Sequence, residues 1–155
     1  MTEPRQVAEE LQKTLLSGSY AWNDSGRFSG RAHVQQRLLS GLALAIGNEP
    51  VVHAEVRVEE ETIHITVLTD TRVHKAYAED NETLGTESWS RSSLMSVDLR
   101  GAPNVFAQLG DDQTATEVTL TFRGGQIVRL GGNQQNVAST LALRNLYPVL
   151  LASLS

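Results

Sequence analysis

The sequence predicts an α+β fold in which two N-terminal helices precede a strongly bent antiparallel sheet of six to seven strands, capped by a C-terminal helix. Two observations predict it. Apolar residues recur every three to four positions before residue 50 and after residue 133, but at every second position from Val51 onward. The strand-like segments are also short and separated by turn residues, which favours antiparallel pairing because parallel strands need long crossover connections.

The first fifty residues carry two helical patterns. The first has Pro4 in its opening turn, one apolar stripe at helical spacing, and Gly18 at its end. The second runs from about Gly30 to Ile46, and Gly47 provides a left-handed cap that stops it. Residues 17–32 lie between them and are rich in Ser, Gly, Asn and Asp, which predicts a long loop.

Alternating apolar and polar residues predict strands from Val51 onward. The predicted strands are residues 51–59, 62–70, 72–80, 94–100, 116–122 and 126–131, with a further short strand expected in residues 104–110. Residues 133–155 return to helical spacing, with Asn133 or Asn136 as the cap. Pro148 is expected to kink or shorten that last helix, because proline lacks the amide hydrogen that a helix needs.

This order resembles the pleckstrin-homology-like (PH-like) superfold, and in particular the small bacterial domains of that type. The resemblance is carried by "VLTDTRVHKAY" (67–77), "SSLMSVDLR" (92–100) and "VTLTFRGGQIVRLGG" (118–132), which follow one another in the order typical of those domains. It covers residues 51–155 and implies a barrel-like bent sheet with the last helix at one end. Residues 1–50 fall outside it, and we expect them to form a helical extension of one compact domain, covering an edge or face of the sheet.

Composition and charge exclude several classes of protein. The chain has 155 residues, a formal net charge of −5 and no cysteine, so disulfides, thiolate nucleophiles and cysteine zinc sites are excluded. A negative surface opposes nucleic-acid phosphates and anionic membranes, so neither is expected as a partner. The acidic N-terminus is unlike an export signal, and no apolar run approaches the ~20 residues that span a bilayer. A cytoplasmic location is therefore expected.

Two glycine pairs, Gly124-Gly125 and Gly131-Gly132, raise the question of a phosphate site. A phosphate-binding turn needs Gly-x-x-x-x-Gly-Lys-Ser/Thr or Gly-x-Gly-x-x-Gly between a strand and a helix, so that backbone amides converge on the anion. Neither spacing is present, and the lysine is missing. The first pair is therefore predicted to form a two-residue hairpin turn, and the second a corner between the last strand and the last helix.

The histidines raise a metal hypothesis, because His53, His64 and His74 recur on three successive predicted strands. His64 lies between two isoleucines and so points away from their apolar face. No His-x-x-x-His spacing or nearby carboxylate pair supports a ligand set, and no metal or other cofactor is expected. There is also no Gly-x-Ser-x-Gly elbow, and no catalytic residue is predicted.

Candidate contacts for a ligand or partner are Trp22, His53, Arg72 and His74. Arg72 belongs to the Thr-Asp-x-Arg segment of the resemblance, and it either satisfies Asp70 and nearby turn carbonyls or contacts a ligand. Trp22 lies in a loop that is unusually rich in aromatic residues, and it is either a core anchor or part of a recognition surface.

Function is expected to be recognition rather than catalysis. The resemblance implies a scaffold for peptides, proteins or lipid headgroups, but Glu59, Glu60 and Glu61 lie where inositol-lipid-binding relatives carry basic residues, so phosphoinositide binding is not expected. The leading hypothesis is a cytosolic protein or peptide interaction module, self-association included, with a groove between an edge strand and the last helix. The alternatives are a small-molecule-binding protein or enzyme that uses a cavity in the curved sheet, and a docking arm built from the N-terminal helices.

Overall fold

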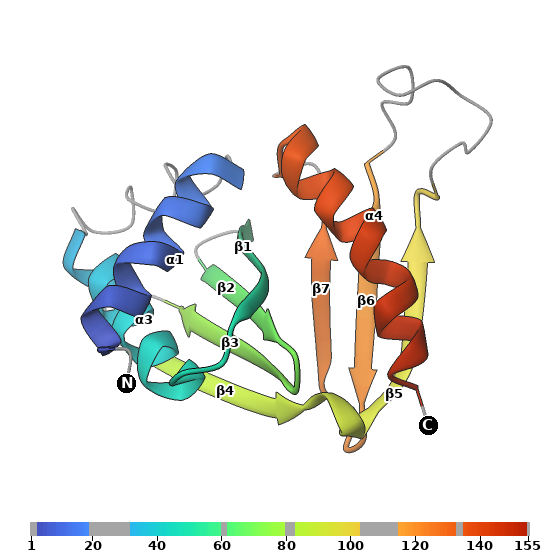
Figure 1. The fold of residues 1–155 in the computed structure, drawn as a ribbon, viewed down its shortest axis with the longest axis horizontal. Helices are drawn as coiled ribbons and strands as arrows, with labels where there is room; N and C mark the ends of the chain where they lie inside the picture. Colours follow the sequence, from blue (N-terminus) through green and yellow to red (C-terminus); the bar gives the residue numbers. More distant parts are fainter. Residues whose placement is uncertain are drawn as a thin grey trace.

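The computed structural model describes residues 3–18, 32–59, 62–79, 83–102, 115–132 and 135–154 (Figure 1). The elements are α1 (Pro4–Gly18), α3 (Ala32–Ile46), β1 (Val51–Glu59), β2 (Thr62–Thr69), β3 (Arg72–Ala78), β4 (Leu84–Ser90), the 3₁₀ turn η1 (Arg91–Ser93), β5 (Leu94–Arg100), β6 (Glu117–Phe122), β7 (Ile127–Gly131) and α4 (Val137–Ala152). Trp22 and the strand expected in residues 104–110 lie outside the described residues.

The strands form two antiparallel sheets, a first sheet in the order β1-β2-β3-β4 and a second in the order β5-β6-β7. The α+β class and the C-terminal helix are therefore confirmed, but the prediction of one bent, barrel-like sheet is wrong. The chain leaves the first sheet at η1 and enters the second (Figure 1). Each sheet buries an apolar face under its own helices, so neither needs to close on itself to exclude water.

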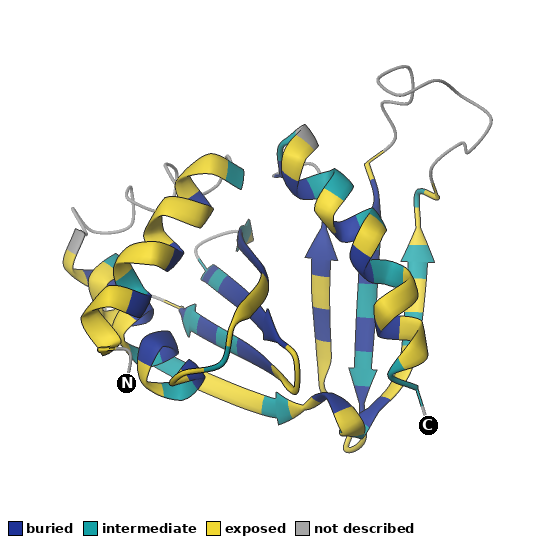
Figure 2. Cartoon of the chain, in the orientation of Figure 1, coloured by how far each residue is buried: buried dark blue, intermediate teal, exposed yellow. Residues whose placement is uncertain are grey.

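The first sheet is covered by the two N-terminal helices, with α1 over β1 and α3 over β3 and β4 (Figure 1). Its apolar face carries cross-strand neighbours such as Val56, Ile65 and Ala76, all fully buried. They pack with α1 and α3 residues in one core. The helices thus cover a face of the sheet, as expected from the sequence, and their outer sides are exposed (Figure 2).

The second sheet buries its apolar face against α4. Phe122, Leu130 and Leu143 lie at the centre of this second core, and Leu68 and Val73 at the β2–β3 turn of the first sheet join it. The first sheet therefore has apolar contacts on both faces at this one end. The Trp89 ring stacks on Phe122 with centroids 5.5 Å apart, which extends the contact from β4 to β6.

The helix ends follow the predicted chemistry. Asn136 caps α4 by accepting a hydrogen bond from the Ser139 amide, and Gly47 has φ of 62° at the end of α3. The α4 helix continues past Pro148 to Ala152, so the proline does not shorten it. No helix in the described part of the chain is long and apolar enough to cross a membrane.

Arg91 joins the β2–β3 turn to the end of α4. Its buried guanidinium donates to the carbonyls of Thr69 and Asp70 at 2.9 and 3.1 Å, and to the Ser153 hydroxyl at 2.9 Å. The turn carbonyls that the sequence associated with Arg72 are thus satisfied by Arg91, from a segment about twenty positions later.

Candidate functional site

The face of the first sheet that points away from α1 and α3 is polar over much of its area. Alternation along the strands places Glu55, Thr66 and Lys75 in one cross-strand row, and Arg57 and His64 in the next. Near the β2–β3 turn this face is covered by the second core. Within the polar rows, Glu55 and Thr66 are buried, whereas Arg57, His64 and Lys75 are half-buried.

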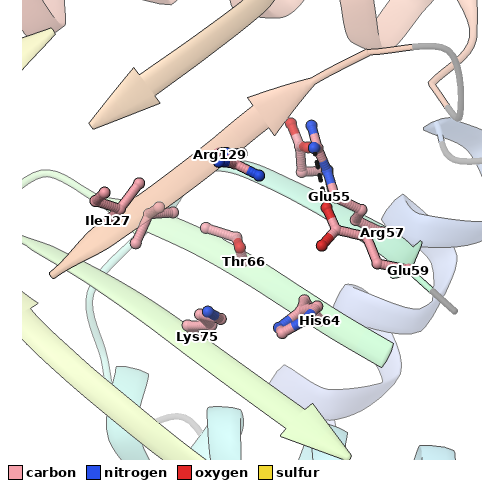
Figure 3. A pocket seen from close by; sticks show the side chains of 9 residues that line it. Glu55, Arg57, Glu59, His64, Thr66, Lys75, Ile127 and Arg129 are labelled. Atoms are coloured by element: carbon pink, nitrogen blue, oxygen red, sulfur yellow. Dashed lines mark hydrogen bonds and ion pairs between the residues drawn. The ribbon is translucent and has the colours of Figure 1, made fainter. Parts of the chain in front are cut away.

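This polar face is hollowed where the edge of β7 crosses it. The polar hollow, as we call it, has a volume of about 180 Å³. Its lining comes from the first sheet (Glu55, Arg57, Glu59, His64, Thr66, Lys75) and from residues 127–129 of β7 (Figure 3). Three cationic side chains and two carboxylates line it, which gives one net positive charge on a protein whose overall charge is −5.

Side chains hold β1 against β7. The Gly131 amide donates to both oxygens of the Glu55 carboxylate, at 3.0 and 2.8 Å, and the Gly131 carbonyl accepts from Arg57 Nη2 at 2.8 Å. Nε2 of His53 lies 2.8 Å from the same Glu55 carboxylate, and Gln135 donates to the Val56 carbonyl at 2.9 Å. We call the set of Glu55, Arg57 and Gly131 the clamp; its hydrogen bonds, two of them to a buried carboxylate, fix the back wall of the polar hollow.

Within the clamp, Gly131 has a backbone conformation that favours glycine. Its φ is 86°, and a Cβ atom there would lie 2.2 Å from the Thr116 carbonyl oxygen and 2.6 Å from Cδ2 of Leu143. Gly131-Gly132 is therefore the predicted corner between strand and helix. The Gly131 amide does bind an anion, but that anion is the chain's own Glu55 carboxylate.

The other pair, Gly124-Gly125, lies in the β6–β7 turn, but the predicted two-residue hairpin is wrong, because three residues separate the hydrogen-bonded Phe122 and Gln126. Both residues have positive φ, 96° and 90°, and the hairpin is closed by a hydrogen bond of 2.9 Å from the Phe122 amide to the Gln126 carbonyl.

Charges in the polar hollow are unevenly paired. Arg57 lies 3.2 Å from Glu59 and 3.8 Å from Glu117. By contrast, within the described ranges neither Lys75 nor Arg129 has a carboxylate oxygen within 4.0 Å. The nearest acidic neighbour of Lys75 by strand register is the exposed Glu87 on β4. Two cations therefore face the hollow without a counter-ion within 4.0 Å among the described residues.

His64 supplies a neutral polar group beside these cations. Burial lowers the pKa of its imidazole, and the charge of Lys75 lowers it further, while Glu59 opposes the shift. Its Nδ1 atom is buried and has no hydrogen-bond partner in the described part of the chain. Buried polar atoms are normally paired, so a ligand that bonds this nitrogen would have to displace the atoms that cover it.

The described residues that the sequence predicted as ligand or partner contacts do not line the polar hollow. His53 is buried against Glu55 and borders a different hollow between α1 and the start of β1. His74 is buried on the face that β3 turns toward the helices, with Nδ1 2.7 Å from the Ser88 hydroxyl, and Arg72 is exposed at the start of β3. Neither His74 nor Arg72 lines the polar hollow. Among the described residues, no group of three or more His, Asp or Glu side chains is placed to hold a metal ion.

Sequence reasoning missed His64, Thr66, Lys75 and Arg129 as a group. Three of them could have been found from strand parity, because they occupy the non-apolar positions of β2 and β3. Arg129 could not, since β7 meets the first sheet through contacts between segments more than seventy positions apart.

Comparison with protein-family models, curated proteins and solved structures finds no match. The resemblance to PH-like domains therefore remains a prediction from the order of the elements.

Proposed function

We propose that the protein is a non-enzymatic binding module and that the polar hollow receives its ligand. The observation that carries this proposal is the pair of cations, Lys75 and Arg129, that face the hollow without a counter-ion in the described chain. Concave sites with a few convergent polar groups are the usual form of a ligand site.

Size favours a small molecule over a peptide. The volume of about 180 Å³ is below the roughly 300–1,000 Å³ typical of sites for drug-sized ligands. The proposal thus follows the small-molecule alternative of the sequence analysis, with a different set of residues. It does not require catalysis, because Glu55 is engaged by Gly131 and Glu59 by Arg57, which leaves neither carboxylate free to act as a general base.

A thermal-shift panel tests the proposal. Small anions, cations and neutral metabolites at millimolar concentration would be compared on the wild-type protein and on Lys75→Met and Arg129→Met variants. We expect at least one compound to raise the midpoint of unfolding of the wild-type protein, because a ligand that binds only the folded state stabilises it. The rise should be lost in both variants.

The matched controls are Lys13→Met and Arg123→Met, which remove exposed cations from α1 and from the β6–β7 turn. They should retain the full shift. If every compound that stabilises the wild-type protein stabilises Lys75→Met and Arg129→Met equally, the polar hollow is not the binding site.

Self-association through β5 is a second candidate, and it keeps the interaction-module hypothesis. β5 is an edge strand, and no described element lies beyond it (Figure 1). Antiparallel pairing of two copies centred on Leu99 would set Asp98 opposite Arg100 of the second copy, twice per dimer. Light scattering should then show a dimer whose dissociation constant rises about five- to thirtyfold in Asp98→Arg, since two ion pairs become repulsions. A wild-type monomer at millimolar concentration would rule this candidate out.

A further inference from the structure

We infer that the ligand of the polar hollow is a small monocarboxylate with a hydroxyl or amino group near its carboxylate. This inference rests on the proposed function. It is carried by Lys75 and Arg129, which lie on either side of Thr66 without a counter-ion among the described residues, and by the buried Nδ1 of His64, which has no partner among them (Figure 3).

The carboxylate end is defined by Lys75, Arg129 and Thr66. Thr66 lies directly opposite Lys75 in the β2–β3 register, so their Cβ atoms are about 5 Å apart. Arg129 enters from β7 on the other side of Thr66 in Figure 3. A hydroxyl flanked by an ammonium and a guanidinium suits a carboxylate, which accepts the two parallel N–H bonds of an arginine fork and further donors on its remaining lone pairs.

Charge balance favours a monoanion over a phosphate dianion. The lining carries one net positive charge, from three cations and two carboxylates, and a single carboxylate neutralises it. A dianion would leave an excess negative charge beside Glu55, which is 2% exposed, and beside Glu59.

The second polar group of the ligand is inferred from His64. This histidine lies two residues from Thr66 on the same face of β2, about 7 Å along the strand. Its Nδ1 is buried without a partner, and burial and the Lys75 charge keep the imidazole neutral. A neutral imidazole offers one nitrogen as an acceptor, so a hydroxyl or amino hydrogen of the ligand supplies the missing hydrogen bond.

The carbon skeleton of the ligand is expected to be short. Ile127 and Val128 form the apolar wall of the hollow, and Ile127 is 51% exposed. A skeleton of three or four carbons would cover part of this wall within the available volume of about 180 Å³.

Calorimetric titration with matched acids tests the inference. Lactate would be compared with propionate, and 3-hydroxybutyrate with butyrate, because each pair differs only by the hydroxyl. We expect the hydroxylated acids to bind about three- to tenfold more tightly, which is the usual worth of one hydrogen bond. The preference should disappear in His64→Phe and return in part in His64→Asn, whose amide can bond the same hydroxyl.

The outcomes separate this inference from the proposed function. Equal binding within each acid pair, tighter binding of inorganic phosphate, or equal binding of lactate and uncharged lactamide would overturn the inference while leaving the hollow as a binding site. If no compound binds and the Lys75→Met and Arg129→Met variants behave as wild type toward all of them, both fail. The comparison of acids on the wild-type protein does not depend on how well any variant folds.

Discussion

At the scale of residues, Glu55 is one of the side chains that join the two sheets, and within the clamp it is the most deeply buried side chain. Its carboxylate is almost fully buried, and it accepts the Gly131 amide hydrogen through both oxygens. Removing it would leave a buried donor without a partner, whereas its neighbour Glu59 is partly exposed and holds only Arg57. These two glutamates on one strand differ sharply in their expected contribution to stability.

We expect Glu55→Ala to lower the free energy of unfolding by about 1–3 kcal/mol, the usual cost of leaving a buried hydrogen-bond donor without a partner. Urea unfolding followed by circular dichroism measures it. Glu59→Ala is the matched control and should cost less than about 1 kcal/mol. Equal losses in the two variants would show that the clamp does not hold the sheets together.

His64 provides a prediction that depends on pH. Its pKa lies below the ordinary value of 6.5 because of burial first and the Lys75 charge second. In Lys75→Met the second cause is removed, so the pKa should rise toward 6.5 but stay below it. A nuclear magnetic resonance titration of the imidazole C–H signals measures this, and an unchanged or lower pKa in the variant would contradict the placement of Lys75 beside His64.

The direction in which stability changes with pH follows from the lowered pKa of His64. Below about pH 6.5 the unfolded chain binds a proton at His64 that the folded protein resists, so the free energy of unfolding falls as the pH is lowered through this window. His74, whose pKa is also lowered by burial, acts in the same direction. The free energy of unfolding, measured by urea denaturation, should therefore fall less between pH 7 and pH 5.5 in His64→Asn than in the wild-type protein.

At the scale of elements, the corner after β7 depends on glycine at Gly131 for two separate reasons. Its φ of 86° is strained for any other residue, and a Cβ atom would collide with the Thr116 carbonyl. Gly125 in the β6–β7 turn has a similar φ of 90° but open space around it. The two positions therefore separate backbone strain from steric contact.

We expect Gly125→Ala to cost about 1–2 kcal/mol of stability from backbone strain alone. Gly131→Ala should cost at least about 2 kcal/mol more, because the contact must be relieved by moving β7 away from Thr116. Chemical denaturation of both variants measures the difference. Equal costs would mean that the corner has room for a side chain.

Most strands could be predicted because their alternation is local. The segments 51–59 and 94–100 begin and end as the sequence indicated, since apolar residues at every second position have few alternatives to a half-buried strand. β4 was missed because it is largely exposed and its sequence, LGTESWS, shows no apolar alternation. It is held by pairing with β3 and by the close approach of Gly41 in α3 to Thr86.

At the scale of the whole molecule, the site depends on contacts that no local pattern encodes. Glu55 and Gly131 are 76 positions apart, and Lys75 and Arg129 lie in different sheets. The sequence predicted a single curved sheet with His53, Arg72 and His74 as candidates for its cavity. The structure instead makes two sheets, and the hollow forms where the edge of one crosses the polar face of the other.

The central claim is that this crossing forms a binding site for a small acid. Amide chemical-shift mapping with lactate on the labelled protein tests it most directly. The claim predicts that the shifted signals cluster on β2, β3 and β7 around His64, Thr66, Lys75 and Arg129, and that Lys75→Met abolishes them. Saturable shifts centred instead on the α1–α3 surface, or no shifts at millimolar lactate, would contradict it.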